Sequence, residues 1–432
     1  MKFFPADAIE SSSHRWSLAA RFLQSSPLRH TTFRWLWLGG LGSFLGTWIH
    51  NVAVRWTAAT VSTSPLAVSS VDTLQILPVV LLSLTAGSLA DSIDRRRLLV
   101  TTHVSLTAIT LTMGILAVSG RLGLPSLLVL TAIIGALGAL NGPAWQATVP
   151  RQVPDEEVTG AVALISTSFN VARTLGPTIG AWVLLSFGIA AAFFFNAASY
   201  LAIGLVMWRL PPQPPSRVRR GSLASPLTDH SLRRFYVVVL LFGLFAMPCL
   251  SLLPIIARDA LHGSAFTYGT LLSAFGIGAA CTGLFISSMS RKLGYTRFVA
   301  LTCLTSASGL ALLTVSQRPL IAALGAAVCG MGWIGTISTS NAAVNTRSRA
   351  EVRGRALSFY LLFAIGGQAG GSFLAGWMAQ QFGVMPVLRA CMLLLVFLAL
   401  GVFKLSVHTE EAPSGSSFSL EQVASSAIAG ED

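Results

Sequence analysis

Long apolar segments separated by short polar turns alternate along most of the chain. Each segment is about 20 residues long, which suffices for a helix that crosses the hydrocarbon core of a bilayer. The predicted spans are Leu36–Thr60, Leu66–Ala90, Leu98–Ser119, Pro125–Val149, Val158–Leu185, Ala190–Leu210, Phe235–Ala257, Phe266–Met289, Phe298–Val315, Leu320–Asn345, Ala356–Gln380 and Pro386–Leu405. The pattern predicts an all-α integral membrane protein with twelve transmembrane helices.

The composition agrees with a membrane location and changes how the net charge is interpreted. Of the 432 residues, 53% are hydrophobic and 10% are charged, against about 25% charged in soluble domains. The net charge of +13 would suit nucleic acid, but most Lys and Arg residues lie in the loops on one side of the predicted helices. Such loops stay in the cytoplasm. We therefore expect a multi-pass plasma (inner) membrane protein with both termini cytoplasmic, the lipid bilayer as a partner and no nucleic acid.

The chain divides into two halves at a Pro-rich, basic segment after the sixth span. The predicted organisation is a cytoplasmic N-terminal tail (1–32), a six-helix bundle (33–210), a cytoplasmic linker (211–234), a second six-helix bundle (235–406) and a disordered C-terminal tail (407–432). At one constant offset, Phe187 and Gly188 correspond to Phe382 and Gly383. Such parallel repeats predict two bundles related by a pseudo-twofold axis, around a central cavity.

The loop after the second span carries an acid and a cluster of arginines. From Gly87 it reads Gly-Ser-Leu-Ala-Asp-Ser-Ile-Asp-Arg-Arg-Arg, which resembles the signature between helices 2 and 3 of the major facilitator superfamily. In that family the acid and the basic residues lock the cytoplasmic side in the outward-open state. The resemblance implies this gating role for Gly87, Asp91, Arg95 and Arg96, although Asp94 stands where the commonest form has Gly. The alternative is a charge cluster that only orients the helices.

The fifth span contains small residues around a proline. Gly176, Pro177 and Gly180 resemble the antiporter motif of helix 5 in proton-driven exporters of this superfamily. Uniporters and symporters typically lack that motif, so the resemblance implies export; ordinary packing of small residues is the alternative. Arg173 lies inside the same span, and an arginine there must face protein or water. We therefore expect Arg173, with Asn170 on the same face of the helix, to line the cavity.

Further stretches narrow the resemblance to one branch of the superfamily. The ends of span 1 (46–56) and span 4 (141–150) are similar to the branch that includes the bacterial enterobactin exporter and macrolide efflux proteins. The likeness runs from about Phe33 to about Leu405. It implies a bacterial, drug:proton antiporter type of protein with the major facilitator fold.

Charged groups inside the membrane are the candidates for proton coupling. Asp72 is the only one of 16 acids that lies within a predicted span. At about 1.5 Å per residue, Asp72 and Arg55 lie at similar depths on adjacent helices, so an ion pair is expected. The carboxylate either couples transport to protons or forms a static pair whose cation keeps it ionised. His50 titrates near neutral pH when unperturbed and is a further coupling candidate, or a residue of helix packing; His103 receives no role.

These features together predict a secondary active exporter that exchanges protons for a small amphipathic or apolar compound, such as a siderophore, a macrolide-like drug or a secondary metabolite. The chain has no phosphate-binding Gly-x-x-x-x-Gly-Lys-Ser/Thr loop and no catalytic or metal-ligating cluster. We therefore expect no ATP, no cofactor besides the proton gradient, no enzymatic activity, and function as a monomer. A proton-coupled importer of the same fold, or a non-transporting scaffold or sensor, remains open. Candidates for the substrate path are Asn51, Gln75, Asn170, Asn341 and Gln368.

Overall fold

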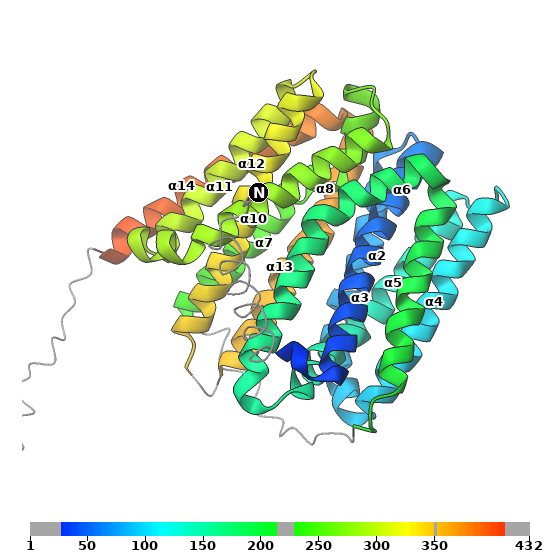
Figure 1. Cartoon of the computed structure of the whole chain (residues 1–432). Helices are drawn as coiled ribbons and strands as arrows, with labels where there is room; N and C mark the ends of the chain where they lie inside the picture. The colour runs from blue at the N-terminus through cyan, green and yellow to red at the C-terminus, as the bar shows by residue number, and fades with distance from the viewer. Residues whose placement is uncertain (1–26, 214–228, 350–351, 411–432) are drawn as a thin grey trace, which may run out of the picture.

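The computed structural model describes residues 27–213, 229–349 and 352–410, and within these ranges the regular secondary structure is helical throughout (Figure 1). The first half comprises η1 (Pro27–Arg29), α2 (Thr31–Val61), α3 (Pro65–Ser92), α4 (Arg95–Val118), α5 (Leu124–Thr148), η2 (Pro150–Gln152), η3 (Asp155–Glu157) and α6 (Val158–Trp208). The second half comprises α7 (His230–Ala246), α8 (Pro248–Ser251), α9 (Leu253–Ile255), η4 (Ile256–Ala260), α10 (Ala265–Leu293), α11 (Tyr295–Val315), α12 (Pro319–Arg347), α13 (Arg353–Phe382) and α14 (Val384–Glu410). The predicted all-α membrane fold is confirmed.

Each of the twelve predicted spans is helical. Ten helices in the described ranges are long and apolar enough to cross a membrane. One of these, Asp155–Trp208, has 54 residues and would measure about 80 Å if straight, far more than one bilayer. It contains the fifth and sixth spans, joined at Gly188, whose φ of 82° breaks the helix. The first span lies in α2, which has 31 residues.

The seventh span is the one that departs from a simple helix. The sequence predicts a continuous helix from Phe235 to Ala257, but the structure divides this stretch among α7, α8, α9 and η4. Pro248 and Pro254 lie at the starts of α8 and α9, and proline removes a backbone donor from the helical ladder. The predicted span is present as one apolar stretch, Leu232–Ala260, and two prolines six positions apart divide its helix into these pieces.

The two halves repeat the same local geometry. Gly188 (φ 82°) and Gly383 (φ 85°) both turn the chain between its last two spans in each half. Gly176 of α6 packs on Trp48 of α2, and Gly371 of α13 packs on the backbone of α7. The glycine pairs that correspond in sequence therefore sit in corresponding packing positions, as a duplicated bundle requires.

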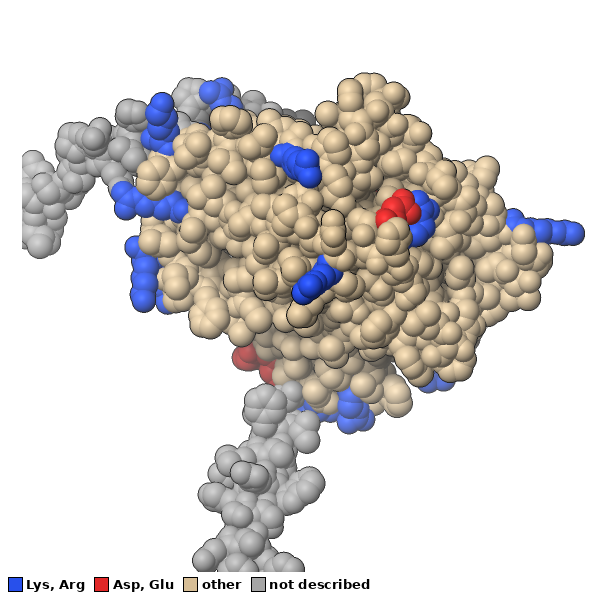
Figure 2. All heavy atoms as spheres, turned by 90° about the horizontal axis from the view of Figure 1, so that it is seen from above, with Lys and Arg blue, Asp and Glu red and all other residues tan. Residues whose placement is uncertain are grey.

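The bundles make contact mainly at one end. We call the end that carries residues 93–94, 149–157, 209–213 and 229 the linker side, and the end that carries residues 62–64, 188 and 261–264 the opposite side. The bundles meet toward the top of Figure 1, on the opposite side, and diverge toward the bottom. Seen from above, the opposite side is a closed surface with few charged side chains (Figure 2).

The ends of the predicted domains differ slightly from the helices. Helix α2 begins at Thr31, inside the predicted N-terminal tail, and α14 continues to Glu410, four residues into the predicted C-terminal tail. Residues 1–26, 214–228 and 411–432 lie outside the described part of the chain, and so the character of the tails and the linker stays a prediction.

Candidate functional site

The first seam between the bundles joins α6 to α10. A Cβ added at Gly276 of α10 would lie 3.0 Å from the carbonyl oxygen of Arg173, and one added at Gly269 would overlap the Cβ of Ala181. Thr178 and Ser273 share a hydrogen bond at the same level. Glycine thus permits close approach of the two helices, and the antiporter-like segment of α6 packs directly on the second bundle.

The second seam joins α3 to α13 and reaches deep into the molecule. The Ser64 hydroxyl donates to Oε1 of Gln380 (2.6 Å) at the surface, and Thr73 approaches the carbonyl of Ala369 (3.5 Å) farther in. Gln380 and Ala369 are eleven positions apart on one helix, about 16 Å at the usual rise. The two helices are therefore in contact over roughly half the length of a helix that spans the bilayer.

Arg258 closes the opposite side from the second bundle. Its Nη1 donates to the carbonyl oxygens of Ser62 (2.9 Å) and Ala59, at the C-terminal end of α2. Asp259 holds the guanidinium through two further bonds of 2.5 and 2.8 Å. A cation at a helix C-terminus satisfies carbonyls that lack partners and complements the helix dipole.

We expect Arg258→Gln to loosen this closure. Hydrogen bonds from a charged donor contribute about 1.5–3 kcal/mol, so the conformation closed on the opposite side should lose population by about tenfold or more. The measurement is labelling of Ser64→Cys by a membrane-impermeant maleimide, in a background where the exposed Cys281 is serine. Arg318→Gln, which removes an exposed charge on the same side, is the control. Equal labelling of both variants would contradict a closing role for Arg258.

A cleft opens toward the linker side where α6 and α10 part. Its volume is about 840 Å³, and α6, α10 and α12 supply its walls. Arg173 lies at its apex, directly beyond the contact with Gly276, and Asn170 and Ser338 lie farther along. The cleft lies on the linker side of the contacts that Gly269 and Gly276 make with α6.

Arg173 is half-buried on the wall of this cleft. Its Nε is buried without a hydrogen-bond partner, and the described residues include no ion-pair partner for it. At the corresponding position of the second half, Gln368 bonds back to the Ala364 carbonyl (3.1 Å) of its own helix. At this position the first half therefore carries a positive charge, and the second half carries an uncharged amide.

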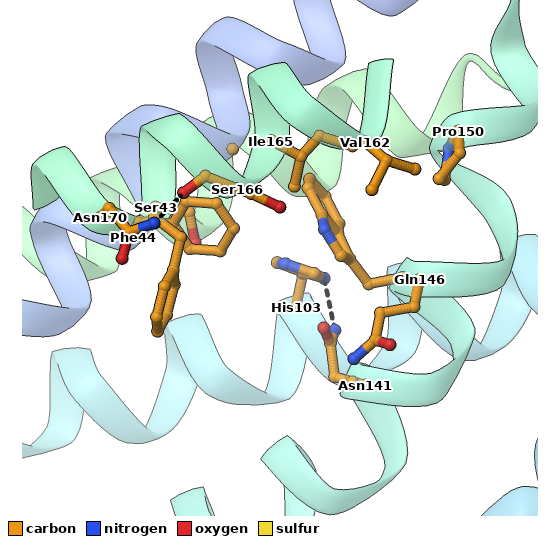
Figure 3. A pocket seen from close by; sticks show the side chains of 14 residues that line it. Ser43, Phe44, His103, Asn141, Gln146, Pro150, Val162, Ile165, Ser166 and Asn170 are labelled. Atoms are coloured by element: carbon orange, nitrogen blue, oxygen red, sulfur yellow. Dashed lines mark hydrogen bonds between the residues drawn. The ribbon is translucent and has the colours of Figure 1, made fainter. Parts of the chain in front are cut away.

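A second cavity, of about 620 Å³, lies inside the first bundle among α2, α4, α5 and α6. His103, which sequence reasoning left without a role, forms part of its wall beside Asn141 (Figure 3). His103 Nδ1 lies 2.8 Å from the Leu99 carbonyl oxygen and 3.1 Å from Nδ2 of Asn141. Asn170 lines both cavities. In the sequence, His103 could have been recognised through Asn141, a polar residue in the end of the fourth span (141–150).

The Arg55–Asp72 pair forms on the closed side. Both Nε and Nη2 of Arg55 lie 2.7 Å from Oδ1 of Asp72, whose side chain is 1% exposed. Tyr268 of α10 interacts electrostatically with both residues, and its ring stacks on Trp56 (6.1 Å between centroids). The pair therefore lies where the second bundle packs on the first, and apart from the open cleft.

The remaining coupling and path candidates occupy separate places. His50 is buried, its ring packs edge-on against Phe193, and its Nδ1 has no partner. Gln75 donates to Oδ1 of Asn51 (3.0 Å), which ties α3 to α2. Asn341 is half-buried on α12, one turn from Ser338 of the cleft. Of the five candidates for the substrate path, Asn170 lies on a cavity wall. The side chains of Asn51, Gln75 and Gln368 form hydrogen bonds within their own helix or with a neighbouring helix.

The gate motif is described in part. Asp94 caps α4 by accepting a hydrogen bond from the backbone N–H of Arg97 (3.1 Å), which explains an acid where the commonest signature has Gly. Arg95 is buried, and Arg96 donates to the Trp208 carbonyl at the end of α6. Gly87 and Asp91 belong to α3, but that part of the helix has no described side chains. The gating role stays a prediction.

Two repeated helical bundles, joined at one end and parted at the other, define the class of two-bundle membrane transporters. A family model described as transmembrane secretion effector matches residues 23–428. The chain belongs to this family of the major facilitator superfamily, whose members are transporters and not enzymes.

Curated relatives and solved structures agree with this assignment. The staphyloferrin A transporter of Staphylococcus aureus is 24% identical over 58% of this chain and 66% of its own length. A putative multidrug resistance protein of Shigella flexneri, MdtD, is 30% identical over 44% of this chain and 40% of its own. Both matches thus cover less than two thirds of the relative. A bacterial homologue of the human lysosomal transporter Spinster, solved in an inward-facing and unoccupied conformation, shares the fold with a TM-score of 0.71 at 13% identity, over 88% of this chain and 97% of that one.

Proposed function

We propose that the protein is a secondary active exporter, which exchanges protons for a small amphipathic or apolar compound by alternating access. The observation that supports it most strongly is the cleft of about 840 Å³ between α6 of the first bundle and α10 and α12 of the second, combined with the contacts that join the bundles on the opposite side. Loops on the linker side carry the arginine clusters, so the positive-inside rule puts this side in the cytoplasm. In this proposal the cleft faces the cytoplasm, in an inward-open state that takes up a compound from there.

Two further features support export over import. The antiporter-like Gly176, Pro177 and Gly180 lie in the seam where α6 meets α2 and α10, so the motif takes part in the contact that must open and close. The relatives named for siderophore and multidrug functions suggest the substrate classes to try first. Alternating access around a midplane site needs no cofactor besides the proton gradient.

The test is substrate-dependent proton movement in proteoliposomes of defined orientation. Purified protein is reconstituted with a pH-sensitive dye inside, and a citrate-type siderophore, a macrolide and a lipophilic dye are added in turn. Antiport predicts that substrate uptake into the lumen is accompanied by lumenal alkalinisation, and that an imposed pH gradient drives uphill accumulation. Protons that move in the same direction as the substrate would instead indicate the proton-coupled importer. The absence of any protein-dependent flux would leave the scaffold or sensor alternative.

A further inference from the structure

We propose that the site selects anions: its ligand carries an acidic head group, held by Arg173, and an aromatic or apolar body, held in the cavity of the first bundle. This inference rests on the proposed transport function and names the substrate class of the same site. It narrows the expectation of a small amphipathic or apolar compound, and the following contacts carry it.

The first step is the charge of the cavity walls. Among the described residues that line the two cavities, Arg173 and His103 are the ionisable ones, and no Asp or Glu is among them. Asp72, the acid within a span, is already paired with Arg55 on the closed side. The accessible site is therefore neutral or positive, and it offers an organic cation no countercharge.

The second step is the state of the donors. Arg173 Nε and Trp145 Nε1 are both buried without hydrogen-bond partners, and each residue lines one of the two cavities. Buried polar groups without partners are costly. Arg173 itself lies on the cleft wall, and a guanidinium binds a carboxylate, sulfonate or phosphate through paired, charge-assisted bonds.

The third step is the space for the rest of the ligand. Phe44 packs edge-on against Trp145 and Phe169, with ring centroids 6.0 and 5.5 Å apart, so these three rings form an aromatic wall on one part of the inner cavity. Figure 3 shows Phe44 and Asn170 at one side of this cavity and Asn141 and Gln146 at another. Asn170 belongs to both cavities and lies one helical turn from Arg173. In this proposal a ligand with its acid at Arg173 extends past Asn170, the lining residue that the two cavities share, onto the aromatic wall.

The test compares three probes with the same body and different charges. Dansylglycine (anion), dansylglycinamide (neutral) and N-dansyl-ethylenediamine (cation) are titrated against the full chain in nanodiscs, and fluorescence anisotropy is read against empty nanodiscs. We expect saturable binding of the anion that is tighter than that of either other probe by about tenfold or more. Arg173→Gln should abolish the preference, Arg173→Lys should retain part of it, and Arg121→Gln, which removes an exposed charge on the opposite side, should leave it unchanged.

The wild-type comparison keeps the proposal falsifiable even if Arg173→Gln fails to fold. Equal or tighter binding of the neutral or cationic probe, or no saturable binding of the anion, overturns it; so does an anion preference that survives in a folded Arg173→Gln protein. The assay contains no proton gradient, and so its outcome is independent of the flux experiment. A proton-driven exporter of cations would retain the proposed function and reject the anion site, while an anion-binding protein without proton exchange would do the reverse.

Discussion

Gly269→Leu should abolish transport by holding the opposite side open. A Cβ at this position already overlaps the Cβ of Ala181 and lies 3.0 Å from the carbonyl oxygen of Pro177, so a leucine cannot fit between α10 and α6. Overpacking costs about 1–3 kcal/mol or more, and about 3 kcal/mol changes the ratio of two conformations by more than a hundredfold. The variant should therefore populate the conformation in which this seam is parted.

Cysteine accessibility measures the shift directly. Ser338→Cys in the cleft should become protected from a soluble maleimide in Gly269→Leu, while Ser64→Cys at the outer end of the α3–α13 seam should react faster. Gly138→Leu is the control, because a Cβ there meets nothing within 4 Å. A steric swap gives the sharper comparison: Gly269→Ala should impair transport, and Gly269→Ala with Ala181→Gly should recover most of it. Unchanged labelling and transport in Gly269→Leu would mean that this seam does not control closure.

The spans could be predicted because the bilayer imposes one length on every helix. Even the joint between the fifth and sixth spans is visible in the sequence, since Gly188 corresponds to Gly383 and both adopt positive φ. The pairing of Arg55 with Asp72 followed from depth alone, because two helices joined by a short turn run side by side. The break in the helix of the seventh span could also have been predicted from Pro248 and Pro254. The long apolar stretch drew attention to the span as a whole and away from the two prolines.

What the sequence could not predict depends on contacts between the bundles or between non-consecutive helices. Arg258 caps α2 from a segment about 200 positions away, and no local pattern specifies which helix end it reaches. His103 is the single ionisable residue of its predicted span, and a role for it is suggested only by the cavity that lies beside it among α2, α4, α5 and α6. Gly269 and Gly276 read as ordinary small residues until α10 is packed on α6.

Replacement of Asp72 distinguishes the two interpretations of its ion pair. Asp72→Asn leaves Arg55 buried without its countercharge, which should lower the free energy of unfolding by about 3–5 kcal/mol. Loss of transport in this variant would therefore not by itself show proton coupling. The informative protein is Arg55→Met with Asp72→Leu, because replacing both partners of a buried pair by apolar groups is often neutral or stabilising.

We expect the double variant to fold, to exchange substrate across the membrane without a gradient, and to lose accumulation driven by a pH gradient. Exchange requires only that the loaded protein change between its two open states, whereas uphill transport requires a group whose protonation differs between them. Asp72 is suited to that task because its pair with Arg55 lies beside Tyr268 of the second bundle, which stacks on Trp56, and we expect the carboxylate to become accessible when the bundles part there. The measurement is substrate counterflow beside gradient-driven uptake in the same proteoliposomes, with Arg121→Gln as the charge control. Full uphill transport by the double variant would make the pair a static element of the seam and transfer the coupling role to His50 or His103.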